Sequence, residues 1–165
     1  MIVYILIALG TFCVMEAITW LTHRFVMHGF LWFLHEDHHK KAPGLFEKND
    51  AFFFIFALPG WLCIMLGSMY QAYWTVSIGW GITMYGLAYF IVHEIIIHQR
   101  FKLFTRSNNR YIKAIRWAHK MHHKHLDKHE GESFGMLLVA KKYWDKVRKE
   151  ESSQEQKIIA TEYTD

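Results

Sequence analysis

The sequence predicts an all-α integral membrane protein with about three transmembrane helices and a cytoplasmic, histidine-rich, helical site for two metal ions. Two observations lead to this prediction. Long apolar runs almost without charge occupy the first part and the middle of the chain, and ten of the 12 histidines repeat one spacing pattern twice. The 165 residues, 52% of them hydrophobic, suit a single domain.

The first apolar run covers residues 1–22 and contains one charged residue, Glu16. Its length matches the roughly 20 residues that cross a bilayer core. No Lys or Arg precedes Arg24 and no small-residue cleavage motif follows, so the run reads as a retained helix and not as a cleaved signal peptide. We expect this helix to continue to His23 or His28.

Glu16 precedes His23 by seven residues, which places both side chains on nearly the same face of a helix. An acid inside a membrane span is costly and usually faces a partner. Two interpretations stay open from the sequence. Glu16 either orients a metal-ligating histidine through a hydrogen bond to its ring, or it is a neutral, hydrogen-bonded acid between helices.

The segment 40–50 is polar and contains Pro43 and Gly44, which is typical of a loop. Asn49 or Asp50 is the expected cap of the helix that follows.

No Lys, Arg, Asp or Glu occurs from residue 51 to residue 92. One helix of that length would be about twice a membrane span. A weakly polar break at 68–73 therefore divides the run into two predicted helices, near 51–69 and 74–98. Three glycines of the second helix are expected to allow close helix approach; they are Gly79, Gly81 and Gly86.

The patterned histidines form the spacing H-x4-H followed by H-x2-HH, twice. They are His23, His28, His35, His38, His39, His93, His98, His119, His122 and His123. In the H-x2-HH motifs the side chains share one helix face. An H-x4-H pair is turned by about 140° on an α-helix, so it needs a helix end, a π-bulge or a metal between helices. Imidazole suits zinc, copper, iron and nickel, and ten imidazoles are enough for two ions.

These motifs resemble the histidine boxes of the membrane fatty acid hydroxylase and desaturase superfamily of non-haem di-iron enzymes. Within it, HRFVMHGFLWFLHEDHH, HEIIIHQRF, AHKMHH and the later SFG are similar to the bacterial β-carotene 3-hydroxylases. The resemblance covers about residues 12 to 140 in order.

The resemblance implies O2-dependent hydroxylation of carotenoid β-rings at C3, which converts β-carotene to β-cryptoxanthin and then to zeaxanthin. It implies two iron ions with the ten patterned histidines as ligands, and zinc as a possible substitute. It also implies a ferredoxin-type electron donor, since the sequence shows no flavin, haem or NAD(P) motif. It identifies no catalytic residue beyond the ligands.

Carboxylates near the histidines are candidates for orienting them from an outer shell. They are Glu16, Glu36, Asp37, Glu94 and Asp127. The two histidines outside the pattern, His125 and His129, are expected to be exposed, and an outer contact of His125 stays open.

The charges predict the topology. Two spans between His39 and His93 return the chain to the same side of the membrane. The segment from Arg100 to Lys128 carries nine Lys and Arg residues and the turn near 68–73 carries none. The positive-inside rule then predicts a multi-pass protein of the cell (inner) membrane, with a cytoplasmic histidine face and the N-terminus outside. Nucleic acid is not an expected partner, because the basic residues flank membrane spans and suit anionic lipid.

The last part of the chain is expected to cover the site. Ser107-Asn108-Asn109 marks a helix start, and apolar residues and histidines then follow at helical spacing. The sequence after Gly131 is amphipathic. We expect a hydroxylase domain over residues 1–150 and a polar, disordered tail over 151–165.

Three alternatives compete with this interpretation. His35-Glu36-Asp37-His38-His39 matches H-E-x-x-H, the motif of a zinc metalloprotease in which Glu36 is the base. A non-enzymatic metal-binding or transport protein would distribute its ligands through the membrane. A lipid or sterol hydroxylase, ketolase or desaturase of the same superfamily would use the same ligands.

Overall fold

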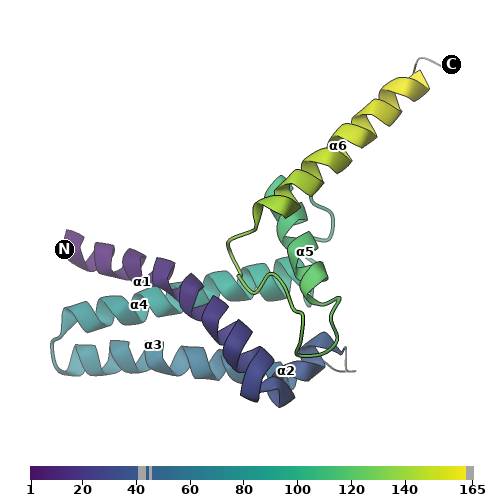
Figure 1. Ribbon diagram of the computed structural model, residues 1–165. Helices are drawn as coiled ribbons and strands as arrows, with labels where there is room; N and C mark the ends of the chain where they lie inside the picture. Colours follow the sequence, from purple (N-terminus) through teal and green to yellow (C-terminus); the bar gives the residue numbers. More distant parts are fainter. Residues whose placement is uncertain (41–43, 45, 163–165) are drawn as a thin grey trace.

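The computed structural model describes residues 1–40, 44 and 46–162, and all regular structure in these ranges is helical (Figure 1). In chain order the elements are α1 (Ile2–Leu21), η1 (Thr22–Phe30), α2 (Trp32–His39), η2 (Lys48–Asp50), α3 (Ala51–Met69), α4 (Tyr73–Tyr89), η3 (Phe90–Ile97), α5 (Arg110–His122) and α6 (Lys141–Glu162). The segments η1 and η3 are π-helical, and η2 is a 3₁₀ turn. The all-α prediction is confirmed.

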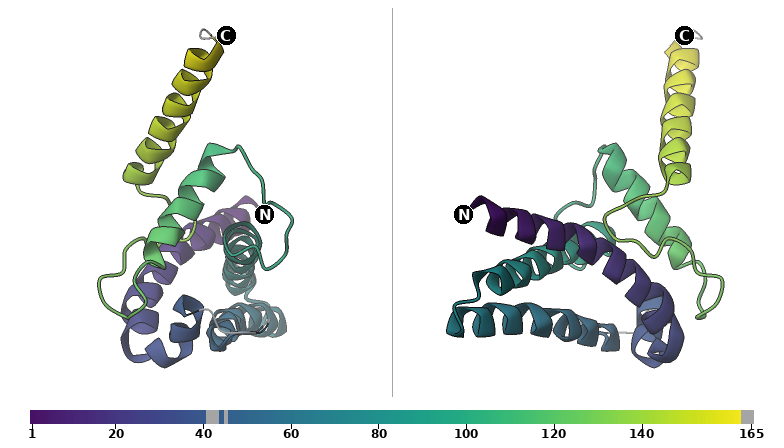
Figure 2. Two further views of the ribbon diagram at one scale, coloured as in Figure 1. Left: turned by 90° about the vertical axis from the view of Figure 1, so that its right-hand side faces the viewer. Right: turned by 60° about the vertical axis from the view of Figure 1, so that its left-hand side comes forward.

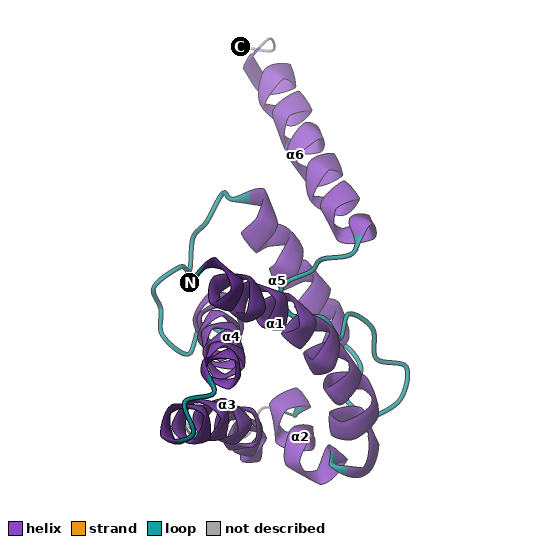
Figure 3. Cartoon of the chain, turned by 90° about the vertical axis from the view of Figure 1, so that its left-hand side faces the viewer, coloured by secondary structure: helices purple, strands orange, loops and turns teal. Residues whose placement is uncertain are grey.

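Three helices are long and apolar enough to cross a membrane: Ile2–Phe30, Lys48–Met69 and Tyr73–Ile97. The two central helices end within one residue of the predicted bounds. The helix α4 packs against both α1 and α3, and Figure 3 looks nearly along α3 and α4, with α1 running obliquely. Large apolar side chains such as Phe54 and Leu9 point outward from the three helices, as they would toward lipid.

Glycines set the spacing of the membrane helices. A Cβ atom at Gly79 would lie 2.7 Å from the Gly60 carbonyl oxygen of α3, and one at Gly81 would lie 2.6 Å from the Ala8 carbonyl oxygen of α1. Larger residues would push α4 away from both neighbours. Nothing lies within 4 Å of the equivalent position at Gly86, so only two of the three predicted glycines have this role.

The histidine-bearing helices gather at one end of the molecule. The N-terminus and the α3–α4 turn lie at the opposite end from α2 and α5 (Figures 1 and 2). This arrangement fits the predicted even number of spans between His39 and His93.

Asp50 occupies the N-cap position of α3, as predicted, but not with a capping side chain. Asp50 makes no side-chain cap of α3; its carboxylate accepts the backbone N–H of Glu47, 3.0 Å away, in a reciprocal capping box on η2. Asn49 faces His35 instead. Pro43 of the predicted loop lies outside the described residues.

The helix α6 projects away from the rest of the protein (Figure 2). Its first turns pack on α5 through a small core of Ala114, Ala118, Tyr143 and Val147. The prediction of a disordered tail fails for residues 151–162, which continue this helix. The segment is rich in Glu, Gln and Lys, which favour helices, and Glu151 forms ion pairs with Arg110 and Lys113 at 2.7 and 3.0 Å. The domain boundary at residue 150 stays a prediction.

Candidate metal centre

The H-x4-H pairs lie in the two π-helical segments. The backbone N–H of His98 donates to the carbonyl oxygen of His93, five residues earlier, at 2.9 Å. The wider π turn brings residues five apart toward one face, whereas an α turn would separate them. Of the three solutions that the spacing allows, the structure uses the π-bulge for both pairs.

Five buried imidazoles form a first group: His23, His28, His35, His39 and His122. One nitrogen of each lies within 4.8 Å of those of all the others. The Nε2 atoms of His23 and His35 are 3.1 Å apart, and those of His28 and His122 are 3.3 Å apart. The group joins the end of the first span to α2 and α5.

Four further imidazoles form a second group: His38, His93, His98 and His119. Their nitrogens also lie within 4.8 Å of one another, and the Nε2 atoms of His98 and His119 are 2.8 Å apart. This group joins α2 to the end of the third span and to α5.

The tenth patterned histidine, His123, lies between the groups. Its Nε2 is 2.7 Å from Nε2 of His119, and its ring stacks on His39 with centroids 4.6 Å apart. The structure thus brings all ten patterned histidines together.

The geometry of these nitrogens fits metal ions. In the first group each Nδ1 has an oxygen acceptor, which leaves Nε2 with its lone pair. Two such Nε2 atoms, as in His23 and His35, cannot hydrogen-bond each other but can share one cation with metal–nitrogen distances near 2 Å. In the second group, Nε2 of His38 is buried and has no hydrogen-bond partner.

Burial favours the neutral form, which ligation requires, for four imidazoles that lie outside the membrane spans. Burial, reinforced by neighbouring histidines, lowers the pKa of His123 to about 3. Burial also lowers the pKa of His35 to about 2, although its hydrogen bond to Asn49 opposes the shift. The pKa values of His38 and His119 fall well below the usual range, again mainly through burial.

Neutral oxygens orient the first group. Backbone carbonyls of one segment, residues 125–140 (the strap), accept hydrogen bonds from four imidazoles, and Asn49 accepts from the fifth, His35, at 2.7 Å. The four pairs are His23 with Phe134 (3.1 Å), His28 with Lys128 (3.4 Å), His39 with His125 (2.9 Å) and His122 with Glu132 (2.9 Å). The strap therefore fixes which nitrogen of each ring faces inward.

Glu16 holds the strap in place. Its carboxylate accepts the backbone N–H groups of three consecutive strap residues, Met136, Leu137 and Leu138, at 2.9 to 3.0 Å. It also accepts the hydroxyl of Tyr85 on α4 at 2.6 Å. Glu16 contacts no histidine directly, so it combines both sequence-based interpretations: a hydrogen-bonded acid between helices that supports the histidines through the strap.

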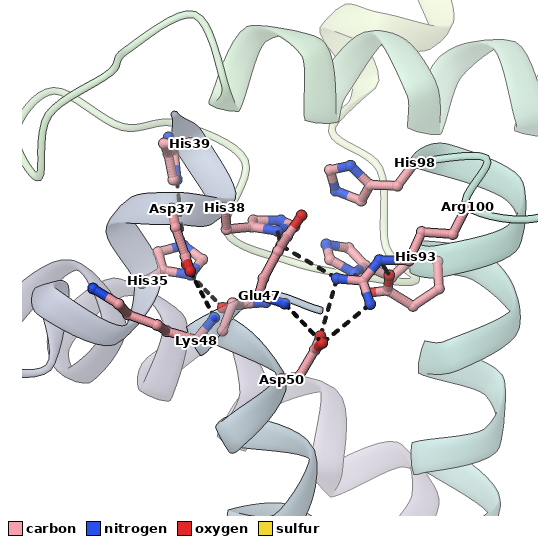
Figure 4. A network of polar contacts seen from close by, with 12 residues as sticks. His35, Asp37, His38, His39, Glu47, Lys48, Asp50, His93, His98 and Arg100 are labelled. Carbon is pink, nitrogen blue, oxygen red and sulfur yellow. Dashed lines mark hydrogen bonds and ion pairs between the residues drawn. The ribbon is translucent and has the colours of Figure 1, made fainter. Parts of the chain in front are cut away.

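Carboxylates orient two imidazoles of the second group, His38 and His93 (Figure 4). Nδ1 of His38 donates to Glu47 at 2.8 Å, and Nδ1 of His93 donates to Glu94 at 2.6 Å. Arg100 lies between the acids, with its guanidinium 2.7 Å from Glu94, 3.2 Å from Glu47 and 3.0 Å from Asp50. One arginine thus links the acidic partners of both imidazoles.

Three of the candidate carboxylates do not contact the ten histidines. Glu36 is exposed and pairs with Lys40 at 2.5 Å. The carboxylate of Asp37 accepts the backbone N–H of Lys48 at 2.6 Å, and that of Asp127 accepts the backbone N–H of His129 at 2.9 Å. Local partners therefore take these acids away from the rings, and of the five candidates only Glu94 bonds to a patterned histidine.

Sequence reasoning missed Glu47, Asn49 and Arg100. The first two lie in the segment that was predicted as a loop and a helix cap, where no sequence signal pointed to the histidines. His129 is exposed as expected. His125 is partly buried and contributes through its carbonyl oxygen, not its ring.

The fold and this site define a class: a helical protein of membrane-spanning type with a buried, double histidine centre suited to metal ions. The chain belongs to the fatty acid hydroxylase family, whose model matches residues 8–149.

Three relatives show which kinds of protein within this family the chain is similar to. The "Beta-carotene hydroxylase" of Pantoea ananas is 41% identical over 136 residues, which cover 81% of this chain and 76% of that protein. The "Beta-carotene hydroxylase" of Pseudescherichia vulneris is 37% identical over 142 residues, which cover 86% of this chain and 80% of that protein. The "Beta-carotene 3-hydroxylase 2, chloroplastic" of Arabidopsis thaliana is 35% identical over 141 residues, covering 81% of this chain and 44% of that longer protein. No solved structure matches the chain significantly.

Proposed function

We propose that this protein hydroxylates carotenoid β-rings at C3 with O2, converting β-carotene to β-cryptoxanthin and then to zeaxanthin. The observation that carries the proposal is the double histidine centre, in a chain 37 to 41% identical to two bacterial proteins named β-carotene hydroxylases. The ten patterned histidines would hold two iron ions. Iron bound there would supply the activation of O2 with two electrons delivered from outside.

The protein's own residues would prepare this chemistry. Burial favours the neutral form of His35, His38, His119 and His123. The strap and the carboxylates orient the rings that they bond. The apolar helices give a hydrocarbon substrate access from the bilayer. A ferredoxin-type donor would deliver the electrons, and the nine basic residues from Arg100 to Lys128 suit an acidic redox partner.

The geometry of Glu36 argues against a metalloprotease. His35 and His39 do lie together, with Nε2 atoms 3.3 Å apart. A general base must reach the reacting water beside the metal, but Glu36 is bound to Lys40 on an exposed face. A transport protein is also disfavoured, because the ligand candidates gather at one end of the spans.

We propose the cell membrane as the location, with the centre on the cytoplasmic side and the N-terminus outside. The positive-inside rule and the two spans between His39 and His93 support this orientation. A reporter enzyme fused to the C-terminus should be active in the cytoplasm. Activity of a periplasmic reporter at the same position would contradict the orientation.

The test of the proposed reaction is pigment analysis of bacterial cells that make β-carotene. Expression of this chain should produce β-cryptoxanthin and zeaxanthin, and a His122→Ala variant at equal protein level should not. Unchanged β-carotene with the wild-type chain and a working donor would refute the proposal. Ketolated or desaturated products would move the chain to another reaction of the superfamily.

A further inference from the structure

A cavity of about 440 Å³ lies between α1, α5 and the strap. Its walls include Trp20 from α1, Ile115 and Ala118 from α5, and Phe134, Leu138 and Val139 from the strap. The SFG motif at residues 133–135 lies in its wall, and the space forms where the strap folds back onto α1.

The cavity borders both histidine groups. His119 of the second group lines it directly. The Phe134 ring, also in its wall, lies against His23, His28 and His122 of the first group, with ring centroids 5.4, 5.1 and 5.4 Å away. A molecule that enters the cavity therefore reaches the centre.

Apart from His119 of the histidine centre, the polar side chains in the wall are already paired. Glu16 accepts the three strap N–H groups and the Tyr85 hydroxyl. The Ser133 hydroxyl donates to Tyr143 at 2.9 Å, and Lys142 is bound to Glu132. A polar ligand would find none of these groups free, whereas an apolar ligand leaves every pair intact.

We propose that this cavity binds the cyclic end of a long hydrocarbon whose remaining chain stays in the lipid. The assignment rests on the proposed function and names the subsite for the reacting ring. Ligand sites that enclose a whole small molecule measure about 300–1,000 Å³, so 440 Å³ suits one ring end better than a complete carotenoid. Leu138, 78% exposed, forms an apolar lip, and Glu16 satisfies the backbone N–H groups that the lip would otherwise present to lipid.

Three variants test the cavity. Ala118→Leu fills it from α5, and Ala140→Trp blocks it from an exposed wall position that tolerates a large residue. Ala17→Leu is the matched control, because it adds the same volume as Ala118→Leu on an exposed position of α1 next to Glu16. The metal content of each purified variant shows whether the centre is intact.

Binding is measured by titrating β-carotene into lipid nanodiscs that contain each protein. The signal is the quenching of Trp20 fluorescence, obtained as the difference between each protein and the same protein with Trp20→Phe. We expect Ala118→Leu, Ala140→Trp or both to weaken binding by about ten-fold or more at normal metal content, with Ala17→Leu unchanged.

Two results separate this proposal from the proposed function. If at least one blocking variant retains metal and both bind β-carotene and yield zeaxanthin like the wild type, the cavity assignment is wrong while the reaction stands. If Trp20 quenching is lost in the blocked variants but the wild type forms no hydroxylated product, the cavity assignment stands and the reaction is wrong. If both blocking variants lose their metal, saturable quenching of Trp20 in the wild type decides, and its absence overturns the assignment.

Discussion

The two histidine groups differ in what orients them. The first group rests on four backbone carbonyls and one amide oxygen, all neutral, and most of these come from the strap about 100 residues further along the chain. The second group rests on the carboxylates of Glu47 and Glu94, linked by Arg100. Similar imidazoles are thus held in two electrostatic environments.

This difference implies two inequivalent metal sites. A carboxylate partner raises the basicity of a ligating imidazole more than a carbonyl does. It also places negative charge near the cation, which Arg100 partly offsets. We therefore expect the second site to favour the more highly charged ion. The first site should depend more on the folding of the strap.

The largest expected effect is the loss of a ligand from either group. His35→Ala in the first group and His38→Ala in the second should each nearly abolish hydroxylated carotenoid, because loss of an orienting partner alone costs about 10–100-fold. The same is expected for the other eight patterned histidines. Pigments of β-carotene-producing cells, with protein levels checked by blot, provide the measurement. Normal product from three or more such variants would contradict the ten-ligand model.

The next effect separates the groups. Glu94→Gln should reduce metal affinity or activity by about 10–100-fold, with the loss confined to one of two metal equivalents. Glu36→Gln is the matched control, because Glu36 is an exposed acid bound to Lys40. Metal analysis and the pigment assay serve both variants. A Glu36→Gln variant that loses more metal or more product than Glu94→Gln would contradict the assignment of Glu94 as the orienting acid.

A smaller effect is expected from releasing the strap. Glu16→Ala removes the acceptor of three backbone N–H groups and should reduce activity by about ten-fold, acting on the first group through Phe134 and Glu132. Tyr85→Phe removes only one bond to the same carboxylate and should act less. Proteolysis of the strap, compared among the two variants and the wild type, measures its release. Equal protection in Glu16→Ala and wild type would contradict the anchoring role.

The smallest expected effect concerns the two histidines outside the spacing pattern, His125 and His129. His129→Ala should retain most activity, because its ring is exposed. His125→Ala should do the same, since its backbone carbonyl, which any residue keeps, accepts from His39. The pigment assay measures both. Inactivity of His129→Ala equal to that of His122→Ala would show that the division of the histidines is wrong.

The sequence predicted most of the fold and the gathering of the ten patterned histidines, because hydropathy and helical spacing are local properties; their role as ligands stays a prediction. The H-x4-H spacing allowed three solutions, one of which is the π-helical distortion found at His93 and His98. Most of the groups that orient the histidines could not be predicted from the sequence. Every residue has a backbone carbonyl, so the sequence does not show which carbonyls accept hydrogen bonds from the histidines. Glu36 and Asp37 have suitable positions in the sequence, but Glu36 pairs with the Lys40 side chain and Asp37 accepts the backbone N–H of Lys48. The helical tail was missed because its ion pairs to α5 depend on tertiary contact.

The central claim is that the chain holds two metal ions in unlike surroundings. The most direct measurement is metal analysis combined with Mössbauer spectroscopy of iron-loaded protein, for the wild type and for Glu94→Gln. We predict about two iron equivalents and two unequal signals in the wild type, and selective loss or shift of one signal in Glu94→Gln. One equivalent in the wild type, or two identical signals that change together in Glu94→Gln, would contradict the account.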